Sequence, residues 1–243
     1  MLYSRAEEPP LLRDIAGQPE YLEGLDGARI AAVDEEFNVL PATGRLGLGR
    51  FVAVNQAGIV CLIEVRHSPR SATHEWLTRK EEVGYTAEDY ALCAASRHEI
   101  TISLMTPVPA PGACSCVLFQ TALIDRLAIL AEAVVYDHEA SRFTSPVRRR
   151  VPDATWPLDV REHIGFQVVG EGKDVCVRTR GMVKFACAEV QAERVPRQNE
   201  TIQLVIAALS DLAQQMATGA RPSAPDTTAD FEEEFVEIPL RAN

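Results

Sequence analysis

Hydrophobic residues alternate with polar or small residues in several short runs along the first half of the chain. These runs occupy residues 28–35, 50–56, 58–65 and 98–104, and segments containing Gly, Asn or Pro separate them. A period of two residues is typical of a strand with one buried face. Between the second and third runs, Gly58 supplies the positive φ that a tight hairpin turn needs. The pattern therefore predicts three consecutive strands and a later fourth.

The same alternation returns in the second half, at residues 163–169, 174–180 and 188–195. The first two runs flank the turn-forming residues 171–173, which predicts a hairpin. The expected inward faces consist of small or β-branched side chains: Val175, Val177, Thr179, Ala188, Val190 and Ala192. The expected outward faces consist mostly of charged or amide side chains: Cys176, Arg178, Arg180, Glu189, Gln191 and Glu193. We expect cross-strand pairs of arginine and glutamate there, each contributing about 0.2–1 kcal/mol, which is a structural rather than a catalytic role.

Longer segments have helical character. Residues 71–98 are predicted to be largely helical, and residues 115–137 form an apolar run whose helix is mostly buried and whose end, near 134–137, reads as a short strand. Residues 199–218 place apolar side chains three and four positions apart, with Asn199 as the expected N-cap. This last helix is expected to pack its stripe against a sheet.

These elements predict an α+β fold in which mixed or antiparallel sheets pack against two long helices in a sandwich-like arrangement. Residues 1–27 are polar and rich in Pro and Gly, and an irregular N-terminal segment is expected there. Residues 28–219 are expected to form a single domain, or two subdomains that meet near residue 97. Residues 220–243 are expected to be a linker followed by an acidic tail.

The tail is too apolar for a purely solvated end, because it contains Phe231, Phe235, Ile238 and Leu240 among its glutamates. These four residues are the candidate partner-binding residues. We expect the segment to dock as an added strand on the protein's own sheet, on a neighbour's sheet, or in the groove of a partner. A tail that only confers solubility is the open alternative.

The net charge limits the classes of partner that are expected, and the cysteines indicate the compartment. With 24 Lys and Arg against 35 Asp and Glu, the formal net charge is −11, which repels nucleic acid and anionic membranes. The six cysteines form no C-x-x-C pair and lie mostly in apolar runs, as reduced thiols of a cytoplasmic protein do. No run approaches the roughly 18 apolar residues of a membrane span, and the N-terminus lacks the pattern of a secretory signal.

Few residues of the chain are candidates for a catalytic or metal-binding role. Asp137, His138 and Glu139 are adjacent and are weak catalytic candidates, because neighbouring strand residues point to opposite faces. His67 and His74 would share a metal only if the loop between them folded both imidazoles inward. The chain has no G-x-S-x-G, H-E-x-x-H or P-loop sequence. No cofactor and no metal are expected.

One spacing carries a resemblance. The pattern T-R-G-x-x-K-F-x-x-x-E is formed by Thr179, Arg180, Gly181, Lys184, Phe185 and Glu189. With the preceding order of strand, long apolar helix and short strand, it resembles an uncharacterised bacterial family known only as a domain of unknown function, over roughly residues 97–217. Where that family has Gly after the Phe, this chain has Ala186. The resemblance implies a compact α/β domain and no particular activity.

Two functions remain open from the sequence. The first is a non-catalytic cytoplasmic module that binds an unknown protein partner, for which a basic surface is one option, as an adaptor, regulator or immunity-type protein does. The second is a small hydrolase that uses a histidine and carboxylate site. Neither nucleic acid nor membrane is an expected partner, and self-association into a homo-oligomer is left open.

Overall fold

The computed structural model describes two compact units of the chain. It describes residues 1–16, 25, 27–41, 44–68, 91, 93–108, 110–144, 159–220 and 241–242. Unit 1 consists of Met1–Pro107, Ser115–His138 and Arg142–Val151, and unit 2 of Val108–Cys114, Glu139–Ser141 and Pro152–Asn243. The chain thus passes between the units several times, and the first passage follows Pro107 rather than residue 97.

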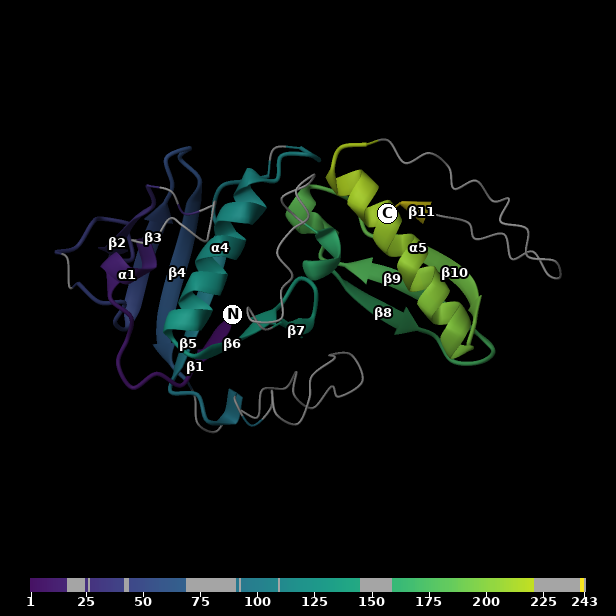
Figure 1. Ribbon diagram of the computed structural model, residues 1–243, viewed down its shortest axis with the longest axis horizontal. Coiled ribbons are helices and arrows are strands. Elements are labelled where there is room, and N and C mark those ends of the chain that lie inside the picture. The colour runs from purple at the N-terminus through teal and green to yellow at the C-terminus, as the bar shows by residue number, and fades with distance from the viewer. Residues whose placement is uncertain are drawn as a thin grey trace. The chain divides into compact units, whose positions relative to one another are not determined.

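Unit 1 is built on a seven-stranded sheet with the strand order β2-β3-β4-β5-β1-β6-β7. Every strand pair of this sheet is antiparallel. The long helix α4 lies along one face of the sheet (Figure 1), where it contacts β5, β1 and β6. The elements are β1 (Leu2–Ser4), α1 (Leu12–Ala16), β2 (Arg29–Val33), β3 (Gly49–Val54), β4 (Val60–His67), β5 (His98–Leu104), α4 (Ser115–Leu130), β6 (Ala133–Asp137) and β7 (Arg142–Thr144).

The predicted alternation of apolar and polar residues along the strands determines which side chains form the core of unit 1. Along β4, Cys61, Ile63 and Val65 are buried, while the residues between them are half-buried. Across the strand pair, Ile63 lies opposite the buried Ile102. The buried side of α4 supplies Cys116, Val117, Phe119, Ala122, Leu123, Leu127 and Ala128. The other residues of the helix are half-buried, except the exposed Ser115 and Ile129, so the helix is shielded over most of its circumference, although fewer of its residues are fully buried than its apolar sequence predicts.

The N-terminal segment differs from the expected irregular structure of residues 1–27. Residues Leu2–Ser4 form β1, which lies between β5 and β6 in the middle of the sheet. Leu2 and Tyr3 are almost fully buried, and the Ser4 hydroxyl donates to the Ala131 carbonyl at 2.8 Å. Three residues are too few to show a period of two, so only the long-range pairing identifies this strand.

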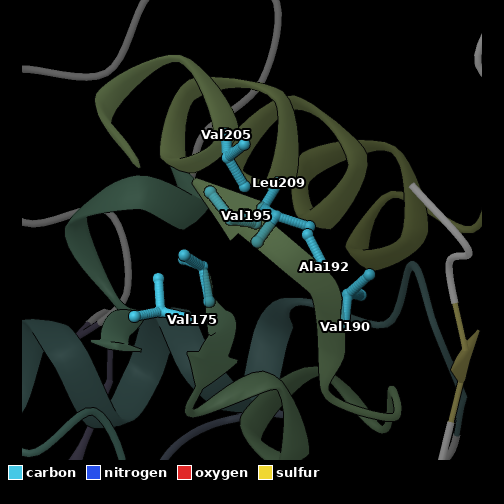
Figure 2. Close-up of a cluster of buried hydrophobic side chains, with 7 residues drawn as sticks. Val175, Val190, Ala192, Val195, Val205 and Leu209 are labelled. Carbon is cyan, nitrogen blue, oxygen red and sulfur yellow. The ribbon is translucent and has the colours of Figure 1, made fainter. Parts of the chain in front are cut away.

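Unit 2 contains a four-stranded antiparallel sheet, in the order β11-β10-β9-β8, against which α5 packs. Figure 2 shows the cluster between them, with Val205 and Leu209 of the helix above Val175, Val190, Ala192 and Val195 of the strands. The elements are the 3₁₀ helix η3 (Val160–Glu162), β8 (Gly165–Val169), β9 (Asp174–Arg180), the 3₁₀ helix η4 (Met182–Phe185), β10 (Val190–Pro196), α5 (Asn199–Ala217) and β11 (Arg241–Ala242).

The apolar stripe predicted for the long helix α5 is confirmed. Val205 and Leu209 are buried, and Ile202 and Ile206 pack against the same cluster. The N-cap is Gln198 rather than Asn199, because the extended backbone that precedes the helix ends at Gln198. After the helix, Gly219 adopts a φ of 78°, the left-handed conformation that ends many helices.

The observed architecture confirms the α+β class, with antiparallel sheets and two long helices. Each long helix covers a sheet of its own unit. The helix predicted over residues 71–98 falls mostly outside the described residues, and only residues 91, 93 and 94 are described as helical there. None of the described helices is long and apolar enough to cross a membrane.

Candidate functional site

The strand β8 forms one edge of the sheet in unit 2. Within the described part of the chain, β8 pairs with β9 on one side and has no strand on the other. Its sequence, Gly-Phe-Gln-Val-Val, contains neither a charged residue nor a proline. An edge strand of this kind presents unpaired backbone N–H and C=O groups that can pair with another strand.

The last two residues of β8 are exposed valines. Val168 and Val169 lie opposite Val177 and Cys176 of β9, and they expose 45% and 42% of their surface. Consecutive strand residues point to opposite faces, so this end of β8 is accessible from both faces of the sheet. Natural edge strands usually carry a charge or a proline at such positions, which β8 lacks.

The start of β8, by contrast, is held tightly. A Cβ added to Gly165 would lie 2.0 Å from the carbonyl oxygen of Ala140, so only glycine fits this approach of two backbone segments. Just before the strand, the Val160 N–H donates to the side-chain oxygen of Gln214 on α5 at 2.8 Å. The accessible end of β8 therefore extends from a rigid base.

A second organised feature is the connection between β9 and β10, which contains the T-R-G-x-x-K-F-x-x-x-E spacing. The Glu189 carboxylate accepts the N–H groups of Gly181 and Met182 at 2.8 and 3.0 Å and the Thr179 hydroxyl at 2.7 Å. The Thr179 oxygen in turn accepts the Val190 N–H at 2.8 Å. Glu189 therefore satisfies the free N–H groups at the start of η4, a structural role.

This arrangement corrects the expected outward position of Glu189. The residue precedes β10, and its side chain turns toward η4 because the unpaired N–H groups there attract a carboxylate. At the other end of η4, Ala186 adopts a left-handed φ of 55°, so the turn forms with an alanine at this position. The Lys184 ammonium donates to the His163 carbonyl at 2.7 Å, which ties η4 to the turn before β8.

The outward face of β9 differs in its pairing from the expectation. The predicted inward set of Val175, Val177 and Thr179 is confirmed as buried. Arg178, however, lies opposite Gln167 and Gln191, and its guanidinium donates to the Gln167 side chain. The expected arginine–glutamate pairing is wrong at this position, because the register of β9 and β10 places Gln191 opposite Arg178 and the two glutamates lie two residues to either side of Gln191.

Unit 1 carries an open cavity of about 360 Å³, lined by Val33, Asp34, Glu35, Gly49, Arg50, Glu64, Val65 and Arg66. Glu64 already bonds both cations, with its oxygen 2.9 Å from Arg50 and 3.4 Å from Arg66. Hydrogen bonds from Asn38 lower the pKa of Asp34, so this carboxyl group is charged over a wide pH range. Because Glu64 is paired with both arginines and Asp34 accepts hydrogen bonds from Asn38, the cavity suggests no defined ligand.

The weak catalytic candidates come from a strand end and the turn after it. Asp137 ends β6 and is half-buried, whereas His138 and Glu139 are exposed. The His138 ring packs edge-on against Tyr136, with centroids 4.7 Å apart; desolvation of the ring by its neighbours, followed by the charge of the N-terminal ammonium, lowers the pKa of His138. Glu139 belongs to unit 2. A hydrolase site formed by these residues stays a prediction.

Several other candidates lie outside the described residues: His74, Phe231, Phe235, Ile238 and Leu240. The described backbone resumes at β11, which pairs with β10 through Val190 opposite Ala242 and Gln191 opposite Arg241. This pairing corresponds to one of the three docking modes open from the sequence, addition of a strand to the protein's own sheet. The partner-binding role of the four tail residues stays a prediction.

The cysteines are free thiols, and three of them are buried: Cys61, Cys93 and Cys116. Cys116 lies in the first turn of α4, where an exposed thiol would have a lowered pKa. Burial raises its pKa instead. Within the described residues, no group of three or more His, Cys, Asp or Glu side chains is placed to hold a metal ion.

The chain matches no protein-family model, no curated protein and no solved structure. Its resemblance to a bacterial domain of unknown function therefore stays a prediction. The candidate function rests on the geometry of the two units alone.

Proposed function

We propose that the protein is a non-catalytic cytoplasmic module, an adaptor, regulator or immunity-type protein, which binds an extended segment of a partner protein along β8. The observation that carries this proposal is the exposure of Val168 and Val169 at the end of an edge strand with no charge and no proline. Main-chain hydrogen bonds to such an edge provide affinity, and alternate side chains of the added strand provide specificity.

The chemistry around β8 indicates the kind of segment that fits. An added strand would place apolar side chains beside Val168 and Val169 on either face of the sheet. The chain has a formal net charge of −11, which disfavours a second copy of itself and favours a partner with a basic surface. The occupant of the edge is therefore an extended, partly apolar segment of a different protein.

Reduced thiols support the cytoplasmic part of the proposal. All six cysteines are free, and burial raises the pKa of Cys61, Cys116, Cys176 and Cys187. A compartment that keeps thiols reduced suits a protein whose cysteines act as small apolar residues.

A peptide selection tests the binding mode. A library of random peptides is selected on the full chain, and the amide hydrogen exchange of β8 is measured with and without a selected peptide. Slower exchange in Gly165–Val169 is expected, because the added strand bonds its free backbone groups. Val168→Lys and Val169→Lys should each weaken peptide binding, since an inward or edge lysine opposes strand addition.

Val183→Lys is the matched control, because Val183 is also an exposed valine of unit 2, 58% accessible, but lies in η4. It should bind the peptide as the wild type does. Selected peptides that protect a different segment, or that bind all three lysine variants equally, would overturn the β8 proposal. Sedimentation of the protein without peptide shows whether two copies instead pair with each other through their β8 edges.

A further inference from the structure

Two histidines that are distant in the sequence lie side by side in unit 1. His67 ends β4, His98 begins β5, and the two residues are directly opposite each other in the antiparallel register. Their ring centroids are 5.8 Å apart and their planes are inclined by 27°. His67 is exposed and His98 is half-buried, so the pair is accessible from solvent at the end of the sheet.

The pair borders a cavity of about 120 Å³. Its other lining residues are apolar or small: Ser4, Ala6, Pro9, Pro10, Leu46, Gly47, Leu48, Val65 and Ile100. A space of this size holds a few water molecules or a small ligand group beside the imidazoles. From this geometry we propose that His67 and His98 together bind one divalent transition-metal ion, with the remaining coordination positions open to the cavity.

The separation of the rings fits a shared ion. A metal–nitrogen bond of about 2.05 Å places each ring centroid roughly 3.2 Å from the ion, so two rings on one ion are at most about 6.4 Å apart. Tetrahedral angles give about 5.2 Å. The observed 5.8 Å lies between these values. Strand pairing fixes the two backbones, and binding requires the exposed His67 ring to rotate about χ2 until both rings direct a nitrogen atom at the ion.

The electrostatic setting selects the class of ion. A neutral imidazole is the form that binds metal. The guanidinium of Arg97 is ion-paired with Glu7 at 3.1 Å, which offsets part of its repulsion of a cation. The described residues that line the cavity include two imidazoles and no carboxylate, which favours Zn²⁺, Co²⁺, Ni²⁺ or Cu²⁺ over Mg²⁺ and Ca²⁺.

Titration calorimetry of the full chain with Zn²⁺, in reducing buffer, tests the site. One ion per chain is expected in a site that involves His67 and His98, and Mg²⁺ should not compete. His67→Ala and His98→Ala should each lower the Zn²⁺ affinity more than about tenfold, since each removes a direct ligand. His138→Ala leaves the pair intact and should bind Zn²⁺ as the wild type does.

Co²⁺ spectroscopy distinguishes this site from the thiols. Bound Co²⁺ should show visible d–d bands without the intense near-ultraviolet band of thiolate ligation. If His98→Ala fails to fold, judged by circular dichroism without metal, the exposed His67→Ala variant decides alone. Unchanged Zn²⁺ affinity in His67→Ala, absence of Zn²⁺ binding to the wild type, or a thiolate band that persists in His67→Ala would each overturn the proposal.

Discussion

The carboxylate of Glu189 accepts the backbone N–H of Gly181 at 2.8 Å and thereby closes the connection between β9 and β10. The same oxygen accepts the N–H of Met182, and the other oxygen accepts the hydroxyl of the fully buried Thr179. The T-R-G-x-x-K-F-x-x-x-E spacing thus has a structural explanation. Threonine, glycine and glutamate are the residues that this closed turn requires.

Glu189→Ala should lower the free energy of unfolding by about 1–3 kcal/mol, because two N–H groups lose their acceptor and the Thr179 hydroxyl loses the nearer of its two acceptors. Glu189→Gln keeps one acceptor oxygen and should cost less. Glu193→Ala is the control and should change stability by less than about 0.5 kcal/mol. Urea denaturation measures all three, and equal losses for Glu189→Ala and Glu193→Ala would contradict the role assigned to Glu189.

Ala186→Gly should stabilise the protein by about 0.5–1 kcal/mol. Ala186 has a φ of 55°, which costs a residue with a Cβ roughly 1–2 kcal/mol, and glycine avoids this cost while losing some chain entropy. The side chain is exposed, so no packing is lost. A lower melting temperature for Ala186→Gly would show that the left-handed conformation carries no strain.

Gly165→Ala should destabilise unit 2 by about 2–3 kcal/mol or more, because its Cβ would lie 2.0 Å from the Ala140 carbonyl oxygen. Backbone atoms cannot rotate away as a flexible side chain can. Gly47→Ala has open space for its Cβ and serves as the control. Thermal unfolding followed by circular dichroism compares them, and similar melting temperatures would refute the close approach.

Leu209→Ala should cost roughly 2–5 kcal/mol, the range for emptying a packed site. Leu209 is 2% exposed and lies between α5 and the sheet (Figure 2), whereas Leu204 on the same helix is 62% exposed. Leu204→Ala should therefore change stability by less than about 0.5 kcal/mol. Denaturant titration of the two variants tests which face of the helix is buried. A larger loss of stability in Leu204→Ala would show that the opposite face is buried.

Local patterns predicted the faces of the strands and helices but not the contacts between distant segments. The alternation of Val175, Val177 and Thr179 was enough to identify a buried face, because strand geometry imposes it. The position of β1 depends on pairing with β5 and β6, which no local period records. Glu189 looked like one more outward residue, since only the folded turn reveals the N–H groups that it binds.

The candidate sites likewise depend on contacts between distant segments, which local patterns do not predict. The sequence grouped His67 with His74 because they are close along the chain, whereas the strand register pairs His67 with His98. The run Gly165–Val169 was predicted as part of a hairpin, but its position at the edge of the sheet depends on the order of all four strands. Residue types can suggest a site, and long-range pairing decides which residues share it.

Alkaline pH should destabilise the protein through its buried thiols and phenol. Burial, with Cys116 nearby, raises the pKa of Cys61 from 9.0 to about 12, and burial also raises the pKa of Tyr3. In the unfolded chain the thiol loses its proton near pH 9 and the phenol near pH 10, whereas the folded chain keeps both protons to higher pH. The stabilisation is therefore fully present below pH 9 and decreases as the pH rises toward 12.

Unfolding free energies measured by urea between pH 8 and pH 10.5 should fall with rising pH, and less steeply in Cys61→Ala and Tyr3→Phe. Alkylation gives an independent reading at the thiol. At pH 8 a thiol with a pKa of about 12 is ionised in only about one molecule in 10⁴, and Cys61 is fully buried. Iodoacetamide should therefore modify Cys61 only after urea unfolds the chain. Rapid modification of Cys61 in the native protein, detected by peptide mass spectrometry, would contradict its burial.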